Sequence, residues 1–246
     1  VSAYMALEDN KLDEAAGLIE PTVTNENTMV KEKTWRYRGM IYQRIAHSDD
    51  ASLKAKYPDA LEKAIASYTK ANELDVKGVE KKANDQALRG LQVLALNSGN
   101  DAFTAKDYDK AVALYAQSEA VAKSFGEVDS NAVFNSALAF ESKGDLGEAL
   151  KRYQQCISFG YDKPEIYRYT ASLQKRQNDL NGAIATTQVG RKKHPDDKEL
   201  MLDEVAFLQE AGRVNEVETS VAEALQKDPG NCVLHSLQAS IFEAKA

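Results

Sequence analysis

The stretch FESKGDLGEALKRY at residues 140–153 decides the fold, because related stretches follow it at a constant spacing. QKRQNDLNGAIATT occupies residues 174–187 and LQEAGRVNEVETSV occupies residues 208–221, so each begins 34 residues after the one before. Small residues and prolines keep this register: Gly144, Asn178 and Gly212; Ala149, Ala183 and Val217; Pro195 and Pro229. A period of 34 residues is typical of a chain built from repeated supersecondary units.

Each unit predicts two helices joined by a tight turn. In DLGEALKRYQQCI (145–157), apolar residues recur at helical spacing, and the preceding SNAVFNSALAFESKG (130–144) has the same periodicity. A glycine or asparagine between the two patterns can adopt the left-handed conformation that ends a helix. Since Ala, Leu, Lys, Glu and Gln dominate throughout and no stretch predicts a strand, an all-α chain is expected.

These units resemble the tetratricopeptide repeat (TPR) family. Its first helix carries Trp, Leu, a small residue and Tyr, and its second carries Ala, an aromatic residue, Ala and Pro. The first pattern occurs as Trp35, Gly39 and Tyr42, with Arg38 where Leu is usual. The second pattern occurs twice more, as Ala64, Tyr68 and Ala71, and as Ala111 and Tyr115. The resemblance implies a right-handed superhelical α-solenoid of antiparallel helix pairs.

The solenoid is expected to fill residues 1–246 as a single domain. A partial first repeat is expected at residues 1–28, followed by two irregular long repeats at 29–77 and 78–129. Three regular repeats follow at 130–163, 164–197 and 198–231, and a terminal helix is expected at 232–246. An insertion predicts a protruding loop near residues 47–57, and a long first helix is expected at 79–105. The insertion is either tolerated drift or a partner-specific loop. The last helix either caps the array or continues into further chain.

Gly39 lies in the middle of a predicted helix, TWRYRGMIYQRIA (34–46). A glycine there costs about 1 kcal/mol relative to alanine. We therefore expect Gly39 to lie where the second helix of its pair crosses, with Trp35 and Tyr42 filling the space beside it.

Composition and motifs argue against several function classes. The formal net charge is -7 and no basic stripe is present, so nucleic-acid binding is not expected. No apolar run reaches the roughly 20 residues of a membrane span. No glycine-rich phosphate loop occurs, and His47, His194 and His235 lack metal-ligand spacing. We expect no enzyme activity, cofactor or metal. Cys156 and Cys232 are expected to be free, because four predicted helices separate them.

The resemblance implies that first helices line a concave groove. The candidate groove residues are Lys33, Arg36, Tyr37, Arg44, Asn97, Asn100, Asn131, Asn135, Arg168, Tyr169, Lys175 and Arg176. Asparagine can bond the backbone of an extended peptide, and arginine can bind a carboxylate through two hydrogen bonds. The groove is therefore expected to bind a polypeptide segment with acidic groups. The alternative is that these side chains are simply solvated.

The expected function is a non-catalytic protein–protein interaction scaffold. One alternative is a regulatory or targeting region of a larger enzyme or sensor, and another is a module that self-assembles through its end repeats. The Lys/Asn clamp with which some TPR proteins bind chaperone tails is not met, since Met40 replaces its first asparagine. A similarity to exported TPR proteins of Gram-negative bacteria implies the periplasm, whereas two unpaired cysteines favour the cytoplasm.

Overall fold

The computed structural model describes residues 2–161 and 163–245, and all regular secondary structure in these ranges is helical. The chain divides into two compact units, residues 1–135 (unit 1) and residues 136–246 (unit 2). Each unit is described by itself. The division falls inside α8 (Ser130–Lys143), which begins in unit 1 and ends in unit 2.

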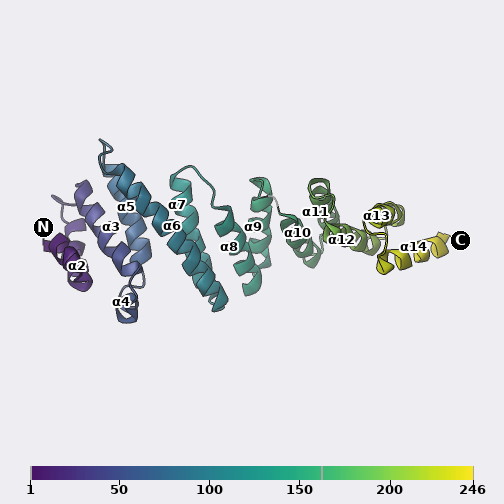
Figure 1. Cartoon of the computed structure of the whole chain (residues 1–246), viewed down its shortest axis with the longest axis horizontal. Coiled ribbons are helices and arrows are strands. Elements are labelled where there is room, and N and C mark those ends of the chain that lie inside the picture. Colours follow the sequence, from purple (N-terminus) through teal and green to yellow (C-terminus); the bar gives the residue numbers. More distant parts are fainter. Residues whose placement is uncertain (1, 162, 246) are drawn as a thin grey trace. The chain divides into compact units, whose positions relative to one another are not determined.

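Unit 1 is built from consecutive helix pairs, in which α1 packs on α2, α3 on α5, and α6 on α7 (Figure 1). Its elements are α1 (Ser2–Glu8), α2 (Leu12–Ile19), the 3-10 helix η1 (Glu20–Val23), α3 (Glu32–Ala46), α4 (Ala51–Lys56), α5 (Ala60–Leu74), α6 (Lys81–Thr104) and α7 (Tyr108–Ser124). The first pair is short, and its leading helix, α1, has 7 residues. The 24-residue α6 confirms the expected long first helix.

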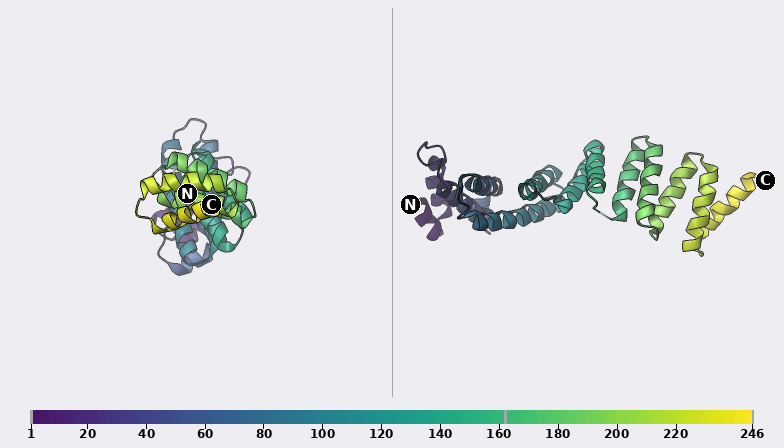
Figure 2. Two further views of the ribbon diagram at one scale, coloured as in Figure 1. Left: turned by 90° about the vertical axis from the view of Figure 1, so that its right-hand side faces the viewer. Right: turned by 90° about the horizontal axis from the view of Figure 1, so that it is seen from above.

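Unit 2 contains the regular repeats. Its elements after α8 are α9 (Leu146–Ser158), α10 (Pro164–Arg176), α11 (Leu180–Lys193), α12 (Lys198–Glu210), α13 (Val214–Lys227) and α14 (Cys232–Lys245). Helices α10 to α13 lie side by side in alternating directions (Figure 2). The described residues thus form an all-α solenoid of helix pairs. Cys156 and Cys232 form no disulfide bond, as expected.

The turn within each regular pair forms as its sequence predicts. Gly144, Asn178 and Gly212 have φ values of 91°, 63° and 67°, which is the left-handed region. Two of them precede an aspartate that caps the next helix: Asp145 accepts from the backbone N–H of Glu148 at 3.2 Å, and Asp179 accepts from that of Gly182 at 2.8 Å. The left-handed residue ends one helix and the aspartate begins the next.

Gly39 lies at the expected crossing. A Cβ atom at this position would lie 3.0 Å from ring atoms of Tyr68 on α5, so the glycine allows the two helices to approach. Tyr42 is fully buried beside it, and Trp35 donates from Nε1 to the Met29 carbonyl at 2.7 Å. The close approach of the helices at Gly39 is as expected, but the ring that lies against the glycine is that of Tyr68 rather than that of Trp35 or Tyr42.

The same device recurs in the next pair, where the sequence analysis did not identify it. A Cβ atom at Gly99 on α6 would lie 2.6 Å from the ring of Tyr115 on α7. Gly99 precedes Tyr115 by the same number of residues by which Ala137 precedes Tyr153. That shared spacing is the signal that would have identified Gly99.

Asp129 fixes the turn between α7 and α8. Its carboxylate accepts from the Ser118 hydroxyl at 2.7 Å, from Gln92 at 3.0 Å and from the backbone N–H of Ala132 at 3.0 Å. Burial raises the pKa of this carboxyl, but the hydrogen bonds outweigh burial and hold the pKa below its usual value of 3.8.

We expect Asp129→Asn to lower the free energy of unfolding at pH 7 by roughly 1–2 kcal/mol, because charge-assisted hydrogen bonds are lost. The pKa in the folded state lies below that in the unfolded chain. The contribution of Asp129 is therefore complete above a pH of about 4 and is lost as the pH falls through the folded-state pKa. Urea unfolding of both proteins at several pH values measures this, and a difference that stays constant down to a pH of about 2 would contradict it.

Candidate functional site

We call the side of each first helix that carries the predicted groove residues the first-helix face. In unit 2, ion pairs between successive repeats cover this face. Arg168 on α10 donates to Asp203 at 2.8 Å and to Glu199 at 3.1 Å, both on α12. The Arg168 guanidinium is therefore already bound on two sides by carboxylates of the same chain.

Two further predicted residues of α10 have the same kind of partner. Lys175 lies 2.5 Å from Glu210 on α12, and Arg176 lies 3.1 Å from Glu141 on α8. The ring of Tyr169 lies 5.5 Å from that of Tyr153. The basic groups of this face thus connect neighbouring repeats. The sequence analysis considered only that these groups bind a partner or are solvated.

The sequence analysis missed the acidic half of this network. Asp203 follows Arg168 by 35 residues, Glu210 follows Lys175 by 35, and Arg176 follows Glu141 by 35. Opposite charges separated by about one repeat length could have predicted these ion pairs from the sequence. The reason is geometric, because such residues lie on neighbouring first helices at nearly the same height.

In unit 1 the predicted residues of α3 are also in contact with the chain itself. Arg36 pairs with Glu32 at 2.8 Å and with Glu80 at 3.3 Å. Tyr37 stacks on Tyr4 with ring centroids 4.7 Å apart. Arg44 donates to the carbonyl of Leu7 at 2.8 Å, at the end of α1. These contacts fix α3 to its neighbours.

Other predicted residues of unit 1 remain open to solvent. Asn97 on α6 is exposed and forms no side-chain hydrogen bond within the described ranges. Lys33 on α3 is exposed, with its ammonium 5.3 Å from the centroid of the Tyr37 ring. Asn100 accepts from Asn135 on α8 at 2.9 Å, and Asn131 is exposed one turn earlier on α8.

The insertion forms a small helix, α4, where the sequence predicts a loop. Asp50 caps α4 by accepting from the backbone N–H of Ser52 at 2.8 Å. The end of the insertion is fixed to α2, because Asp13 lies 2.5 Å from Lys56 and accepts from the Tyr57 hydroxyl at 2.7 Å. Burial and this hydrogen bond raise the pKa of Tyr57 to about 12, so the hydroxyl remains a donor at neutral pH.

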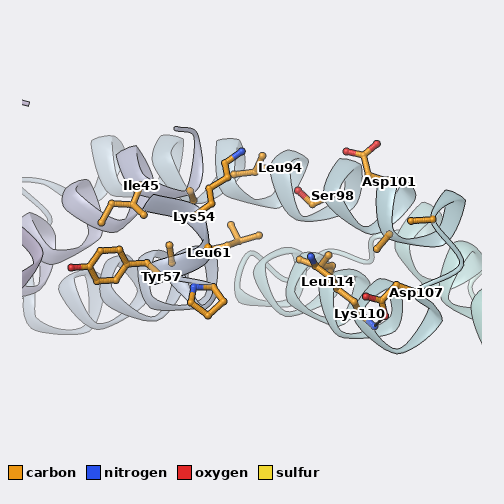
Figure 3. A pocket seen from close by; sticks show the side chains of 16 residues that line it. Ile45, Lys54, Tyr57, Leu61, Leu94, Ser98, Asp101, Asp107, Lys110 and Leu114 are labelled. Atoms are coloured by element: carbon orange, nitrogen blue, oxygen red, sulfur yellow. Dashed lines mark hydrogen bonds between the residues drawn. The ribbon is translucent and has the colours of Figure 1, made fainter. Parts of the chain in front are cut away.

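The α4 helix forms part of a cleft within unit 1, with a volume of about 650 Å³ (Figure 3). One side is formed by the end of α3, by α4 and by the start of α5, and it includes Lys54, Tyr57 and Leu61. The opposite side is formed by α6 and the start of α7, and it includes Leu94 and Lys110. We call this feature the insertion cleft.

Two searches of the described residues bear on the kind of site that the chain offers. Within residues 2–161 and 163–245, no group of three or more His, Cys, Asp or Glu side chains could hold a metal ion. Across the same ranges, none of the helices combines the length and apolar character needed to cross a membrane. The sites that the geometry offers are surfaces and a cleft.

Comparison with protein-family models and with curated proteins finds no match. Solved structures do match. YrrB, described as a TPR protein with an unusual peptide-binding site, gives a TM-score of 0.50 at 15% identity over 62% of this chain and 77% of YrrB. MamA AMB-1 gives 0.50 at 18% identity, over 63% of this chain and 82% of MamA. PilW, described as a type IV pilus biogenesis factor, gives a TM-score of 0.49 at 14% identity, over 96% of this chain and 94% of PilW. The likeness to YrrB and MamA shows that this chain has the TPR fold.

Proposed function

We propose that the chain is a non-catalytic scaffold that binds a polypeptide segment along the first-helix face of unit 1. The observation that carries this proposal is the exposed Asn97, whose amide has a donor and an acceptor free for a peptide backbone. Lys33 supplies a positive charge for an acidic group of that segment. The peptide-binding site described for YrrB, which is similar in fold, supports the same kind of ligand.

The arginines and the other lysine of the predicted groove have a smaller part in this proposal. Arg36, Arg168, Lys175 and Arg176 would have to exchange carboxylates of the chain for those of a partner, which gains little net free energy. Substituting them would also disturb contacts between repeats. Lys33 and Asn97 avoid both difficulties, and they are therefore the better positions for a test.

A pull-down from native extract with crosslinking and mass spectrometry tests the proposal. We expect Lys33→Glu combined with Asn97→Ala to reduce recovery of the partner about tenfold, since a few contacts dominate binding. The matched control is Lys192→Glu combined with Asn181→Ala, the same changes at exposed positions of α11. Crosslinks on α3 and α6 that disappear only in the first variant support the proposal. A partner that both variants keep would refute it.

Self-association is a second candidate, favoured by the exposed face of α14. Phe242 and Val233 are 57% and 71% exposed, whereas Leu208, which stands at the position of Phe242 on α12, is fully buried. A second copy could cover this face. Light scattering would then show a dimer that Phe242→Ser converts to a monomer, and a monomeric parent protein would exclude this candidate.

A further inference from the structure

The α6 helix exposes a face that the corresponding helices bury. In α3, α10 and α12 the residue two places beyond the position of Gly99 is apolar and at most 8% exposed: Ile41, Leu173 and Phe207. In α6 this residue is Asp101, and it is exposed. An aspartate at a position that is otherwise part of the core indicates that nothing in unit 1 covers this part of α6.

The cause is the way α5 approaches α6. The two helices meet where α5 ends and α6 begins, because Asn72 donates to Asp85 at 2.7 Å and accepts from Asn84 at 3.0 Å. At the other end they form opposite walls of the insertion cleft, with Leu61 facing Ser98 across it (Figure 3). Between these ends the two helices stay packed, since Tyr68 on α5 and Leu91 on α6 belong to one hydrophobic cluster. The cleft therefore opens where the 24-residue α6 continues past the start of the 15-residue α5.

The charged groups at the cleft indicate what an occupant must carry. Lys54, Asp101 and Lys110 are exposed there, and none of them forms an ion pair or a side-chain hydrogen bond within the described ranges. The fourth charged group, Asp107, already caps α7 by accepting from the backbone N–H of Lys110 at 3.3 Å. An occupant that covers the apolar walls must provide acids for the two lysines and a base for Asp101.

The size of the cleft suits a short helical segment. One turn of helix, about 10 Å wide and 5.4 Å long, occupies roughly 400 Å³. The cleft volume of about 650 Å³ therefore corresponds to roughly one and a half turns.

We propose that the insertion cleft is a docking site for one amphipathic helix of a partner protein. The docked face carries small and apolar residues against Leu61, Leu94 and Leu114, with acids at its flanks for Lys54 and Lys110 and a base for Asp101. This site is separate from the first-helix face, since Asn97 and Asn100 lie outside the cleft lining. It gives the insertion a function, because α4 supplies one wall and one of the two lysines.

A display library of helical 16-residue peptides, selected against the full chain, tests this proposal. We expect enriched peptides to combine apolar residues at helical spacing with flanking acids and a base. Their synthetic forms are then measured by fluorescence anisotropy. Lys110→Glu should weaken binding at least tenfold, as for other close charge pairs at interfaces. Exchanging one acid of the peptide for lysine should restore binding to this variant.

Lys82→Glu is the matched control. Lys82 and Lys110 both lie in the first turn of a helix and both lack an ion pair, but only Lys110 lines the cleft. An acid in a first turn favours the helix, so both variants should fold. Ser98→Trp, which fills the cleft, should abolish binding. The proposal is wrong if no helical peptide is enriched, or if Lys110→Glu and Ser98→Trp bind the peptides as the parent protein does. It is equally wrong if light scattering shows a dimer that Ser98→Trp dissociates, because a second copy then occupies the cleft.

Discussion

Replacing Gly39 by leucine will lower the melting temperature of the protein by several degrees. Even a Cβ atom at this position would lie 3.0 Å from the ring of Tyr68, and the rest of a leucine side chain has no space. Tyr68 cannot move aside easily, because its hydroxyl donates to Gln43 at 2.7 Å and its ring is 4% exposed. Overpacking of this kind costs typically about 1–3 kcal/mol. Circular dichroism on heating measures the effect.

Gly90→Leu is the control that separates packing from helix propensity. Gly90 also lies in the middle of a helix, α6, but a Cβ atom there would have no neighbour within 4 Å. Leucine should therefore stabilise this position by up to about 1 kcal/mol, since glycine is the poorer helix former. If both substitutions changed the melting temperature in the same direction, the packing explanation of Gly39 would fail.

Replacing Arg191 by methionine will destabilise the protein by about 3 kcal/mol, since it leaves a buried carboxylate without its cation. Arg191 on α11 donates to Glu204 on α12 and, at 2.9 Å, to Glu223 on α13. The Glu204 side chain is 6% exposed, so water would compensate its charge only in part. Methionine keeps most of the length of the side chain, and the loss therefore reports the charge rather than a cavity.

Lys192→Met changes the neighbouring residue in the same helix and should alter stability by at most about 0.5 kcal/mol, because Lys192 is exposed. Adding Glu204→Leu to Arg191→Met should recover most of the loss, since an apolar pair can replace a buried ion pair. Urea unfolding of the three variants measures both effects. A loss that the double variant does not recover would mean that packing around Arg191, rather than its charge, holds α11 to α12.

The 34-residue spacing was sufficient to predict the helix pairs and their turns. Each element depends on residues close in sequence: a left-handed residue such as Gly144, an aspartate cap such as Asp145, and an apolar face at helical spacing. The crossing at Gly39 was also predictable, because this glycine occupies the small-residue position of the repeat pattern between Trp35 and Tyr42. Gly90 occupies no such position, and a Cβ atom there would have no neighbour within 4 Å. Local interactions and the 34-residue repeat therefore determine the helix pairs, and each regular repeat forms the same pair of helices.

The tertiary structure alone decided which predicted groove residues are available. Arg168 and Asn97 look equally suitable in the sequence, but Arg168 pairs with Asp203 one repeat further on, whereas Asn97 is exposed and has no side-chain hydrogen bond in the described part of the chain. The insertion cleft is likewise absent from any local pattern. It arises because α6 continues past the start of α5, and the opening that results depends on how whole helices pack. Candidate groove residues thus differ in availability according to neighbours that lie 30 or more residues away in the chain.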